Sequence, residues 1–307
     1  MLIAQEELKN SIKNLKNSKG GKAKGRFVSS LCFFVWKMKV NEIYEKFNIE
    51  RTSDTDFALA EVLGKNRSEL MFCEVSEKQL KKFLKINKKL EKGYPLDLIL
   101  GFSNFYGRKF LVNKHVLKPR LDTEFVCEKS LEFVDEKSKV LDLCCGSGVI
   151  GITVAKEKEA YVVFADVSRK ALKVCKKNVK AHNACGKVIK SDLFAKINEK
   201  FDVIISNPPY IKTKDIESLE KNVKKFDPRL ALDGGEDGLD FYRKIISQAP
   251  GFLTDEGKLI MEIGFDEGVE VLKLMQKDFF VTLLKDYNNN DRLVIGELKD
   301  GKTRKND

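Results

Sequence analysis

Seven short apolar runs, separated by helical patterns, constrain the fold of this chain more than any other feature. Between residues 140 and 298 these strand-like runs alternate with stretches whose apolar residues recur at helical spacing. The runs are Val140–Leu143, Tyr161–Ala165, Val188–Lys190, Val203–Ser206, Lys258–Glu262, Val281–Lys285 and Leu293–Leu298. The alternation predicts an α/β fold in which helices cover both faces of a mostly parallel sheet. Asn288, Asn289 and Asn290, between the last two runs, predict a hairpin at one sheet edge.

Composition disfavours several kinds of chemistry. The 307 residues include only two histidines, His115 and His182, which argues against Ser-His-Asp triads and histidine metal centres. The seven cysteines contain no C-x-x-C pair, which predicts reduced thiols and no metal. No apolar run approaches the roughly 20 residues that span a bilayer, so we expect a cytoplasmic protein without a membrane partner. A net charge of +11 would suit an acidic partner, although the basic residues are spread along the chain.

Changes in pattern along the chain predict five segments. They are a basic, disordered extension (1–37), a small helical domain (38–93), a hairpin linker (94–118), the α/β domain (119–298) and a charged tail (299–307).

A glycine turn follows the first strand of the α/β domain. Gly146 and Gly148 would let backbone approach a ligand where the next helix presents free N–H groups. With Gly151 they also spell G-x-G-x-x-G, so a nicotinamide dehydrogenase is an alternative. Asp142, expected at the mouth of this turn, would repel a pyrophosphate but attract the ammonium of a methionine moiety. We therefore predict a site for S-adenosylmethionine rather than a dinucleotide.

Two further carboxylates end the next two strands. Asp166 can accept hydrogen bonds from a ribose diol, which both cofactors possess. Asp192 could take an adenine amino group while Leu193 or Phe194 lies against the ring, although an ordinary helix N-cap explains Asp192 equally well.

The sequence Ser206-Asn-Pro-Pro-Tyr210 ends the fourth strand, where such folds bind ligands. Two prolines remove backbone donors, so the turn is rich in acceptors. Asn207, through its side-chain oxygen, and Pro208, through its carbonyl, can accept both protons of an NH₂ group while Tyr210 packs on the flat group. A purely structural Pro-Pro turn is the alternative. An amide nitrogen is a poor nucleophile, so catalysis would rest on alignment with an activated methyl donor.

Several motifs occur together in one order. They are Phe105-Tyr-Gly107, Val112-Asn113, Val116-Leu-Lys-Pro-Arg-Leu-Asp-Thr-Glu124, the glycine turn and Asn207-Pro-Pro-Tyr-Ile211. Two more motifs accompany them, namely Asp56-Phe-Ala-Leu-Ala-Glu-Val-Leu-Gly64 in the helical domain and Phe226-Asp-Pro-Arg-Leu-Ala-Leu-Asp-Gly-Gly235 after the Asn207 turn. The set closely resembles the HemK/PrmC family, the glutamine methyltransferases of peptide chain release factors, over residues 38–298. This chain has Cys144 where the family usually has the first glycine of the turn. It has Leu121 where the family usually has the second proline of a Pro-Arg-Pro stretch.

The resemblance implies a class I S-adenosylmethionine methyltransferase fold with a seven-stranded, mostly parallel sheet and an N-terminal helical domain that recognises the release factor. It implies methyl transfer to the glutamine of the Gly-Gly-Gln loop of class one release factors, with S-adenosylhomocysteine as product. The implied catalytic residues are Asn207, Pro208, Pro209 and Tyr210. The residues implied to contact the cofactor, beside Asp142, are Cys144, Cys145, Gly146, Ser147, Gly148, Asp166, Asp192, Leu193 and Asn207.

Two other functions stay open at the level of sequence. An amino-group methyltransferase acting on RNA or DNA bases would share Asn-Pro-Pro-Tyr and would use a wider stacking slot and a basic channel. A release-factor chaperone without activity is the non-enzyme alternative, which the intact Asn207 to Tyr210 turn disfavours. We expect a monomer that forms no stable complex with nucleic acid.

Overall fold

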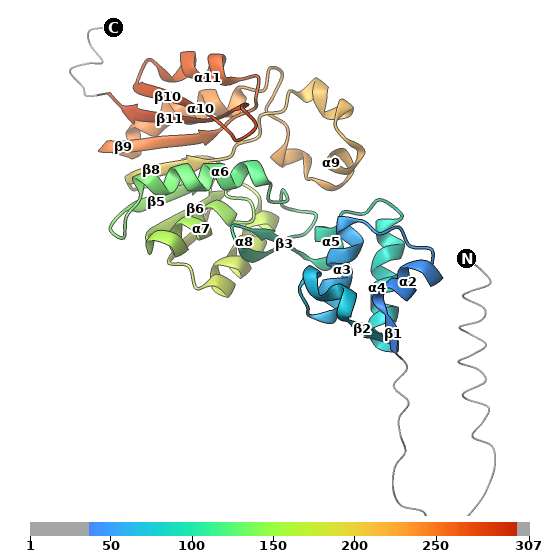
Figure 1. Cartoon of the computed structure of the whole chain (residues 1–307). Helices are drawn as coiled ribbons and strands as arrows, with labels where there is room; N and C mark the ends of the chain where they lie inside the picture. Colours follow the sequence, from blue (N-terminus) through green and yellow to red (C-terminus); the bar gives the residue numbers. More distant parts are fainter. Residues whose placement is uncertain (1–36, 300–307) are drawn as a thin grey trace, which may run out of the picture. The chain divides into compact units, whose positions relative to one another are not determined.

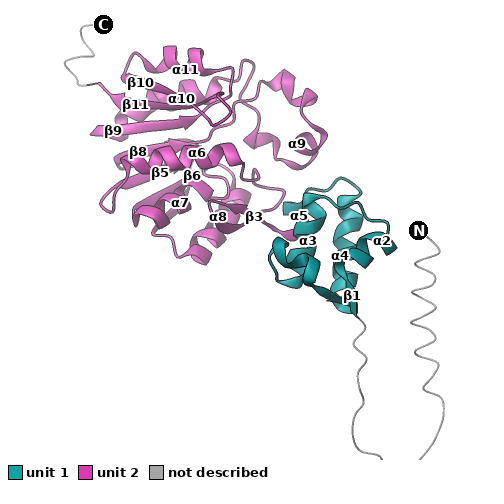
Figure 2. Cartoon of the chain, viewed as in Figure 1, with its two compact units in different colours: residues 1–99 teal, residues 100–307 magenta. Residues whose placement is uncertain are grey.

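The computed structural model describes residues 37–299. The described residues form two compact units, 37–99 and 100–299 (Figure 2). Most of the expected basic extension and charged tail, residues 1–36 and 300–307, lies outside the described residues.

The first unit is mainly helical. Its elements are β1 (Lys37–Lys39), α2 (Val40–Lys46), α3 (Ser53–Leu63), a 3-10 helix (Arg67–Phe72), β2 (Glu74–Ser76), α4 (Glu77–Leu90) and the start of α5 (Leu96–Leu100). Leu59, Leu80 and Phe83 are fully buried between these helices. The antiparallel β1–β2 ribbon was not expected from the helical spacing that begins at Met38. Gly64 ends α3 in a left-handed conformation, with φ of 66°.

A short hairpin opens the second unit. Strands β3 (Phe102–Phe105) and β4 (Arg108–Leu111) pair antiparallel, and Tyr106 and Gly107 form the turn with φ of 47° and 71°. The expected hairpin segment also contains α5, because Pro95 precedes a leucine-rich segment that closes one helical turn, with the Ile99 amide donating to the Pro95 carbonyl. The hairpin is therefore shorter than predicted.

The second unit is built on a seven-stranded sheet, as the sequence predicted (Figure 1). Its strands are β5 (Lys139–Leu143), β6 (Tyr161–Asp166), β7 (Gly186–Lys190), β8 (Phe201–Ser206), β9 (Leu253–Glu262), β10 (Phe279–Lys285) and β11 (Asp291–Leu298). Their order is β10-β11-β9-β8-β5-β6-β7. The pairs on either side of β11 are antiparallel and the others are parallel. The predicted hairpin edge is β10–β11.

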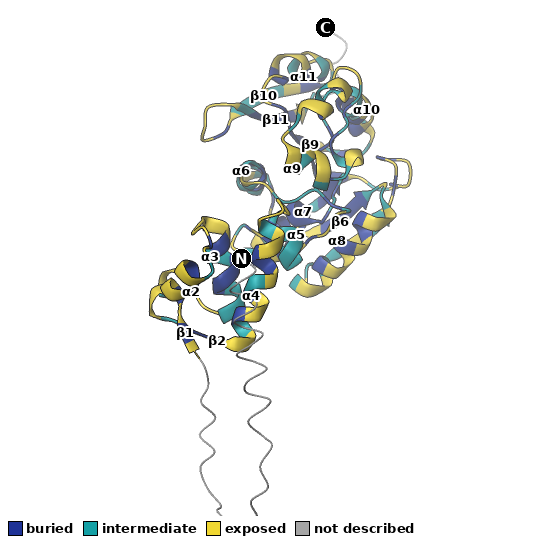
Figure 3. Ribbon diagram, turned by 90° about the vertical axis from the view of Figure 1, so that its right-hand side faces the viewer, coloured by how far each residue is buried: buried dark blue, intermediate teal, exposed yellow. Residues whose placement is uncertain are grey.

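Helices cover both faces of this sheet (Figure 1). They are α6 (Leu121–Ser130), α7 (Val149–Lys158), α8 (Arg169–His182), α10 (Asp240–Gln248) and α11 (Gly268–Met275). The short helix α9 (Lys221–Phe226) belongs to the segment between β8 and α10, which lies beside the sheet and not on its faces (Figure 1). Turns of 3-10 helix occur at Leu131–Phe133, Thr213–Ser218, Arg229–Ala231 and Ala249–Gly251. Alternate strand residues point to opposite faces, so β5 sends Val140 to a core with α6, α7 and α8, and Leu141 to a core with α10 and α11. Figure 3 shows the strands and the inward helix faces buried.

The chain changes direction in this sheet between β5 and β8. From β5 it winds outward through β6 and β7, and then returns to β8 on the other side of β5. The carboxyl ends of β5 and β8 therefore flank the position where open α/β sheets form a ligand crevice. None of the helices described between residues 37 and 299 is long and apolar enough to cross a membrane.

Candidate functional site

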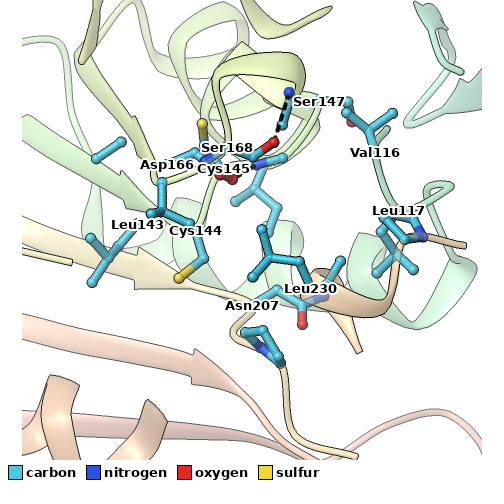
Figure 4. A pocket seen from close by; sticks show the side chains of 18 of the residues that line it. Val116, Leu117, Leu143, Cys144, Cys145, Ser147, Asp166, Ser168, Asn207 and Leu230 are labelled. Atoms are coloured by element: carbon cyan, nitrogen blue, oxygen red, sulfur yellow. Dashed lines mark hydrogen bonds between the residues drawn. The ribbon is translucent and has the colours of Figure 1, made fainter. Parts of the chain in front are cut away.

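One cavity of the second unit lies at the carboxyl ends of the strands (Figure 4). Its lining includes most of the predicted site residues, namely Cys144, Cys145, Gly146, Ser147, Asp166, Asp192, Leu193, Asn207 and Pro209. Asp142, Gly148, Pro208 and Tyr210 are outside this lining. Residues from the ends of four neighbouring strands thus meet at one place, because parallel strands end on the same edge of the sheet.

The glycine turn bends sharply between β5 and α7. Cys144, Gly146 and Gly148 all have positive φ, at 61°, 54° and 83°. A Cβ on Gly148 would come within 2.9 Å of the Cys175 sulfur, whereas a Cβ on Gly146 would meet no atom within 4 Å. Glycine at 148 is therefore required by packing, and Gly146 leaves open space beside the cavity. Cys144 carries the backbone strain that the family's usual glycine avoids.

Asp166 connects β6 to the glycine turn. One carboxylate oxygen accepts a hydrogen bond from the Gly146 amide at 2.9 Å, and the other accepts one from the Ser168 amide at 2.7 Å. Burial raises the pKa of Asp166, while these two backbone hydrogen bonds lower it. Since each carboxylate oxygen has a second lone pair, Asp166 can also face a ribose diol in the cavity.

Asp142 lies beneath the turn rather than at its mouth. Its side chain is buried, one oxygen accepts the Gly151 amide at 2.9 Å, and the other oxygen has no hydrogen-bond partner among the described residues. Asp142 was expected to attract the ammonium of a methionine moiety directly. This buried position does not favour such a contact, because helix α7 covers the carboxylate. A Cβ on Gly151 would lie 2.6 Å from the Phe164 ring, so this third glycine serves close helix–strand packing.

The buried Asp142 carboxyl predicts a pH-dependent stability. Burial raises its pKa from the ordinary 3.8 to about 7, against the Gly151 hydrogen bond. Between these pH values the folded protein holds a proton that the unfolded chain has lost, so the free energy of unfolding falls as pH rises. The expected loss is up to about 4 kcal/mol.

Urea unfolding of wild type and Asp142→Asn at pH 5 and pH 8 would measure this effect. The variant should show a clearly smaller difference between the two pH values. Burial also raises the pKa of Glu262 and of Glu267 to about 7, so both proteins keep the part of the slope due to these groups. Equal slopes in both proteins would contradict the assignment to Asp142.

Asp192 and Leu193 follow the carboxyl end of β7. Both line the cavity, and Leu193 has a φ of 44°, which is rare for a branched residue. Phe194 points elsewhere, since its ring stacks on Phe252 at 4.5 Å between centroids. Of the two apolar residues considered for an adenine face, the structure therefore brings only Leu193 to the cavity.

The Asn207-Pro-Pro-Tyr turn leaves β8 at the opposite side of the cavity from Asp166. Ser206 anchors the strand end, because its hydroxyl donates to the Leu143 carbonyl at 2.8 Å. Asn207 and Pro209 line the cavity, while Pro208 is buried outside the lining. Burial raises the pKa of Tyr210 to about 12, so its phenol is neutral at physiological pH.

A loop after α9 holds this turn in place. The Ile211 amide donates to the Leu232 carbonyl at 2.9 Å, and the Gly234 amide donates to the Ile211 carbonyl at 2.8 Å. A Cβ on Gly234 would lie 2.7 Å from the Tyr210 backbone, so the Asp-Gly-Gly motif permits this close approach.

Arg120 and Glu124 support the site indirectly. The buried Asp227 carboxylate lies 3.5 Å from the Arg120 guanidinium and 3.8 Å from the Lys118 ammonium. Glu124 accepts the Tyr106 amide of the hairpin at 2.6 Å. The stretch from Val116 to Glu124 is thereby joined to Asp227, in the segment after α9, and to the β3–β4 hairpin.

Sequence reasoning missed several residues that shape the site. Thr123, Leu230 and Phe241 line the cavity, and a buried Asn178 joins β4 to the glycine turn. Its amide donates to the Ser147 carbonyl at 2.9 Å and accepts the Leu111 amide at 2.8 Å. These residues lie far apart in the chain. Thr123 and Leu230 fall within two of the family-like motifs but had no predicted role, whereas Phe241 and Asn178 fall outside every motif. Residues 37–299 contain no group of three or more side chains placed to hold a metal.

Comparison with known proteins decides the family. The chain is 39% identical over 259 residues to a release factor glutamine methyltransferase from Bacillus cereus, an alignment covering 80% of this chain and 92% of that relative. The corresponding protein of Clostridium acetobutylicum is 38% identical over 269 residues, covering 83% and 93%. The chain belongs to the release factor glutamine methyltransferase family. Residues 125–235 also match the family described as methyltransferase small domain.

Solved structures agree on the fold of this family member. A methyltransferase from Pyrococcus furiosus matches with a TM-score of 0.50 and 17% identity, covering 69% of this chain and 98% of that chain. The catalytic domain of hMettl16, solved with the MAT2A 3′UTR hairpin 6, matches with 0.50 and 16%, covering 70% and 93%. At these identities the likeness concerns the fold alone. The sheet is that of class I S-adenosylmethionine methyltransferases, as predicted from sequence.

Proposed function

We propose that this protein transfers a methyl group from S-adenosylmethionine to the side-chain amide nitrogen of the Gly-Gly-Gln glutamine in class one release factors. The observation that carries the proposal is the single cavity shared by Asn207 and Pro209 on one side and the glycine turn with Asp166 on the other. Family membership supplies the substrate. The products are the methylated glutamine and S-adenosylhomocysteine.

The residues present suit the cofactor. Asp166 offers two acceptors to a ribose, Asp192 and Leu193 offer an acceptor and an apolar face to an adenine, and Gly146 leaves open space at the turn. When bound there, S-adenosylmethionine supplies an activated methyl group on a sulfonium. Cys144, Cys145 and Ser147 would contact it from the turn, and Gly148 would set the turn's shape without contact.

Asn207 and the backbone of Pro208 would hold the glutamine amide by accepting its two N–H groups. This orientation directs the nitrogen lone pair toward the methyl donor and stabilises the positive charge that develops on nitrogen. Tyr210, neutral and held by the loop after α9, would pack beside the amide. Solvent takes the released proton, so the chemistry needs no imidazole or metal.

We assign the first unit to recognition of the release factor and expect a cytoplasmic monomer. Methylation of a base in RNA or DNA is the weaker alternative, since the relatives that cover most of the chain are named for glutamine methylation.

Radiolabelled S-adenosylmethionine would test the reaction directly. The protein would be offered a purified release factor, the same factor with its loop glutamine changed to alanine, and total RNA. We expect label on the loop glutamine, located by mass spectrometry, and none on the alanine variant. Label in RNA alone would overturn the proposal and establish the nucleic-acid alternative.

A further inference from the structure

We infer that Asn178 is a positioning residue that holds the glycine turn in the shape that binds S-adenosylmethionine, by tying the turn to the β3–β4 hairpin. The inference rests on the proposed cofactor and concerns a residue that lies outside every motif of the sequence. Asn178 is not among the residues that line the cavity, so it acts through the turn and not by contact with the cofactor.

Three hydrogen bonds use the whole side-chain amide of Asn178. Its oxygen accepts the Leu111 amide at 2.8 Å, and its nitrogen donates to the Leu111 carbonyl at 3.0 Å and to the Ser147 carbonyl at 2.9 Å. Leu111 is the last residue of β4, and Ser147 lies in the glycine turn. Asn178 is fully buried, so water does not replace these contacts.

The three partners allow only one orientation of this amide. A backbone N–H can only donate, so the Leu111 amide requires the side-chain oxygen of Asn178. The two carbonyls can only accept, so they require the two hydrogens of the side-chain NH₂ group. A flipped amide would set donor against donor and acceptor against acceptor at Leu111. Asn178 is therefore a rigid link between the hairpin and the turn.

The Ser147 carbonyl belongs to the most conformationally free part of the turn. Gly146 and Gly148 have φ of 54° and 83°, and glycine readily adopts other angles as well. The peptide group between Ser147 and Gly148 is held at both ends, because Asn178 binds its carbonyl and the Cys145 carbonyl accepts its amide at 2.7 Å. Cys145 and Ser147 line the cavity (Figure 4). Loss of the Asn178 contact would therefore free a peptide group beside the cofactor site.

One face of α8 carries both the turn and the hairpin. Cys175, Asn178 and His182 share this face, because they are three and four residues apart. Cys175 packs against the turn, since a Cβ on Gly148 would lie 2.9 Å from its sulfur. At the other end of the face, the His182 ring donates to the Lys109 carbonyl of β4 at 3.0 Å. Asn178 lies between these contacts and joins the two segments directly.

This link couples the cofactor to a segment that it does not reach. The lining of the cavity includes none of the hairpin residues 102–111. A cofactor that stabilises the turn also stabilises its hydrogen bond to Asn178, and thereby the docked hairpin. Thermodynamic linkage makes the effect reciprocal, so an ordered hairpin strengthens cofactor binding by the same factor.

Asn178→Leu tests the link while keeping the approximate volume of the side chain. It removes all three hydrogen bonds, so we expect the Kd for S-adenosylhomocysteine, from calorimetry, to rise about 30-fold or more. The kcat at saturating S-adenosylmethionine should stay within about threefold of wild type, because the Asn207 turn is unchanged. Asn178→Asp keeps the acceptor for the Leu111 amide but loses both donors, and its Kd should rise at least as much.

Ser130→Ala is the matched control for loss of a buried hydrogen bond. Ser130 is also fully buried and donates to a backbone carbonyl, that of Val126 at 2.7 Å, but it is outside the cavity lining. Thermal unfolding without ligand measures the stability of each variant. Wild-type affinity in both Asn178 variants, an equal loss in Ser130→Ala, or a large fall in kcat at unchanged affinity would overturn the inference.

Hydrogen exchange tests the coupling in wild type, so it does not depend on a variant that folds. Saturating S-adenosylhomocysteine should slow exchange of the amides of residues 102–111 by about tenfold or more. The β10–β11 hairpin, at one edge of the sheet, is the internal control and should change much less. Equal protection of the two hairpins would overturn the coupling.

The proposed function fails in a different way. Failure of wild type to bind S-adenosylhomocysteine would overturn the proposed cofactor and this inference together. Binding of the ligand without methylation of a release factor would overturn the proposed substrate and leave the role of Asn178 to be decided by the affinities alone.

Discussion

Replacing Asn207 by alanine is expected to lower kcat by about 10²- to 10³-fold while changing the dissociation constant for S-adenosylmethionine by no more than about threefold. The reason is geometric, because the alanine removes the acceptor that would orient the substrate nitrogen but leaves the turn and Asp166 intact. Single-turnover methylation of a release factor and calorimetric cofactor binding are the two measurements.

Asn207→Asp is the informative companion to this variant. Its carboxylate keeps an oxygen where the acceptor is needed but cannot donate to Thr123. We expect its kcat to lie between those of the alanine variant and wild type. Wild-type turnover in Asn207→Ala would refute the acceptor role of this side chain.

Replacing Asp166 by alanine is expected to weaken binding of S-adenosylmethionine by on the order of 100-fold. Two effects combine, namely the loss of charge-assisted hydrogen bonds to the ribose and the loss of the Gly146 and Ser168 contacts that shape the turn. Calorimetric titration measures the affinity. Thermal unfolding without cofactor separates loss of affinity from loss of the fold.

Asp135→Ala is a matched control for this change. Asp135 also accepts a backbone amide two residues ahead, from Lys137 at 3.0 Å, but it lies before β5, at the opposite end of that strand from the cavity. The control should bind the cofactor as wild type does. Unchanged affinity in Asp166→Ala would show that the carboxylate has no part in the cofactor site.

Local patterns were sufficient for the sheet and for most of its strand ends. Each of the seven predicted strands overlaps an observed one. The central strands β5, β6 and β8 are parallel and almost wholly buried, which requires apolar runs that are visible in the sequence itself. The same reasoning placed Asp166, Asp192 and Asn207 at strand ends, and parallel strands bring such ends together at one edge. The segment after Pro95 was less predictable, because five residues of which four are apolar suit a strand or a helical turn equally well.

The sequence by itself thus determined the fold class, the glycine turn, and the strand ends that meet at the cavity, because these depend on periodicity and on residues adjacent in the chain. Only the tertiary structure decided the direction in which side chains point. It placed Asp142 beneath α7 rather than at the mouth of the turn, and it brought the Asn207 amide within 3.4 Å of the Thr123 hydroxyl, 84 residues away in the chain. Hydrogen bonds between distant segments form only when packing has brought them together, so no local pattern records them.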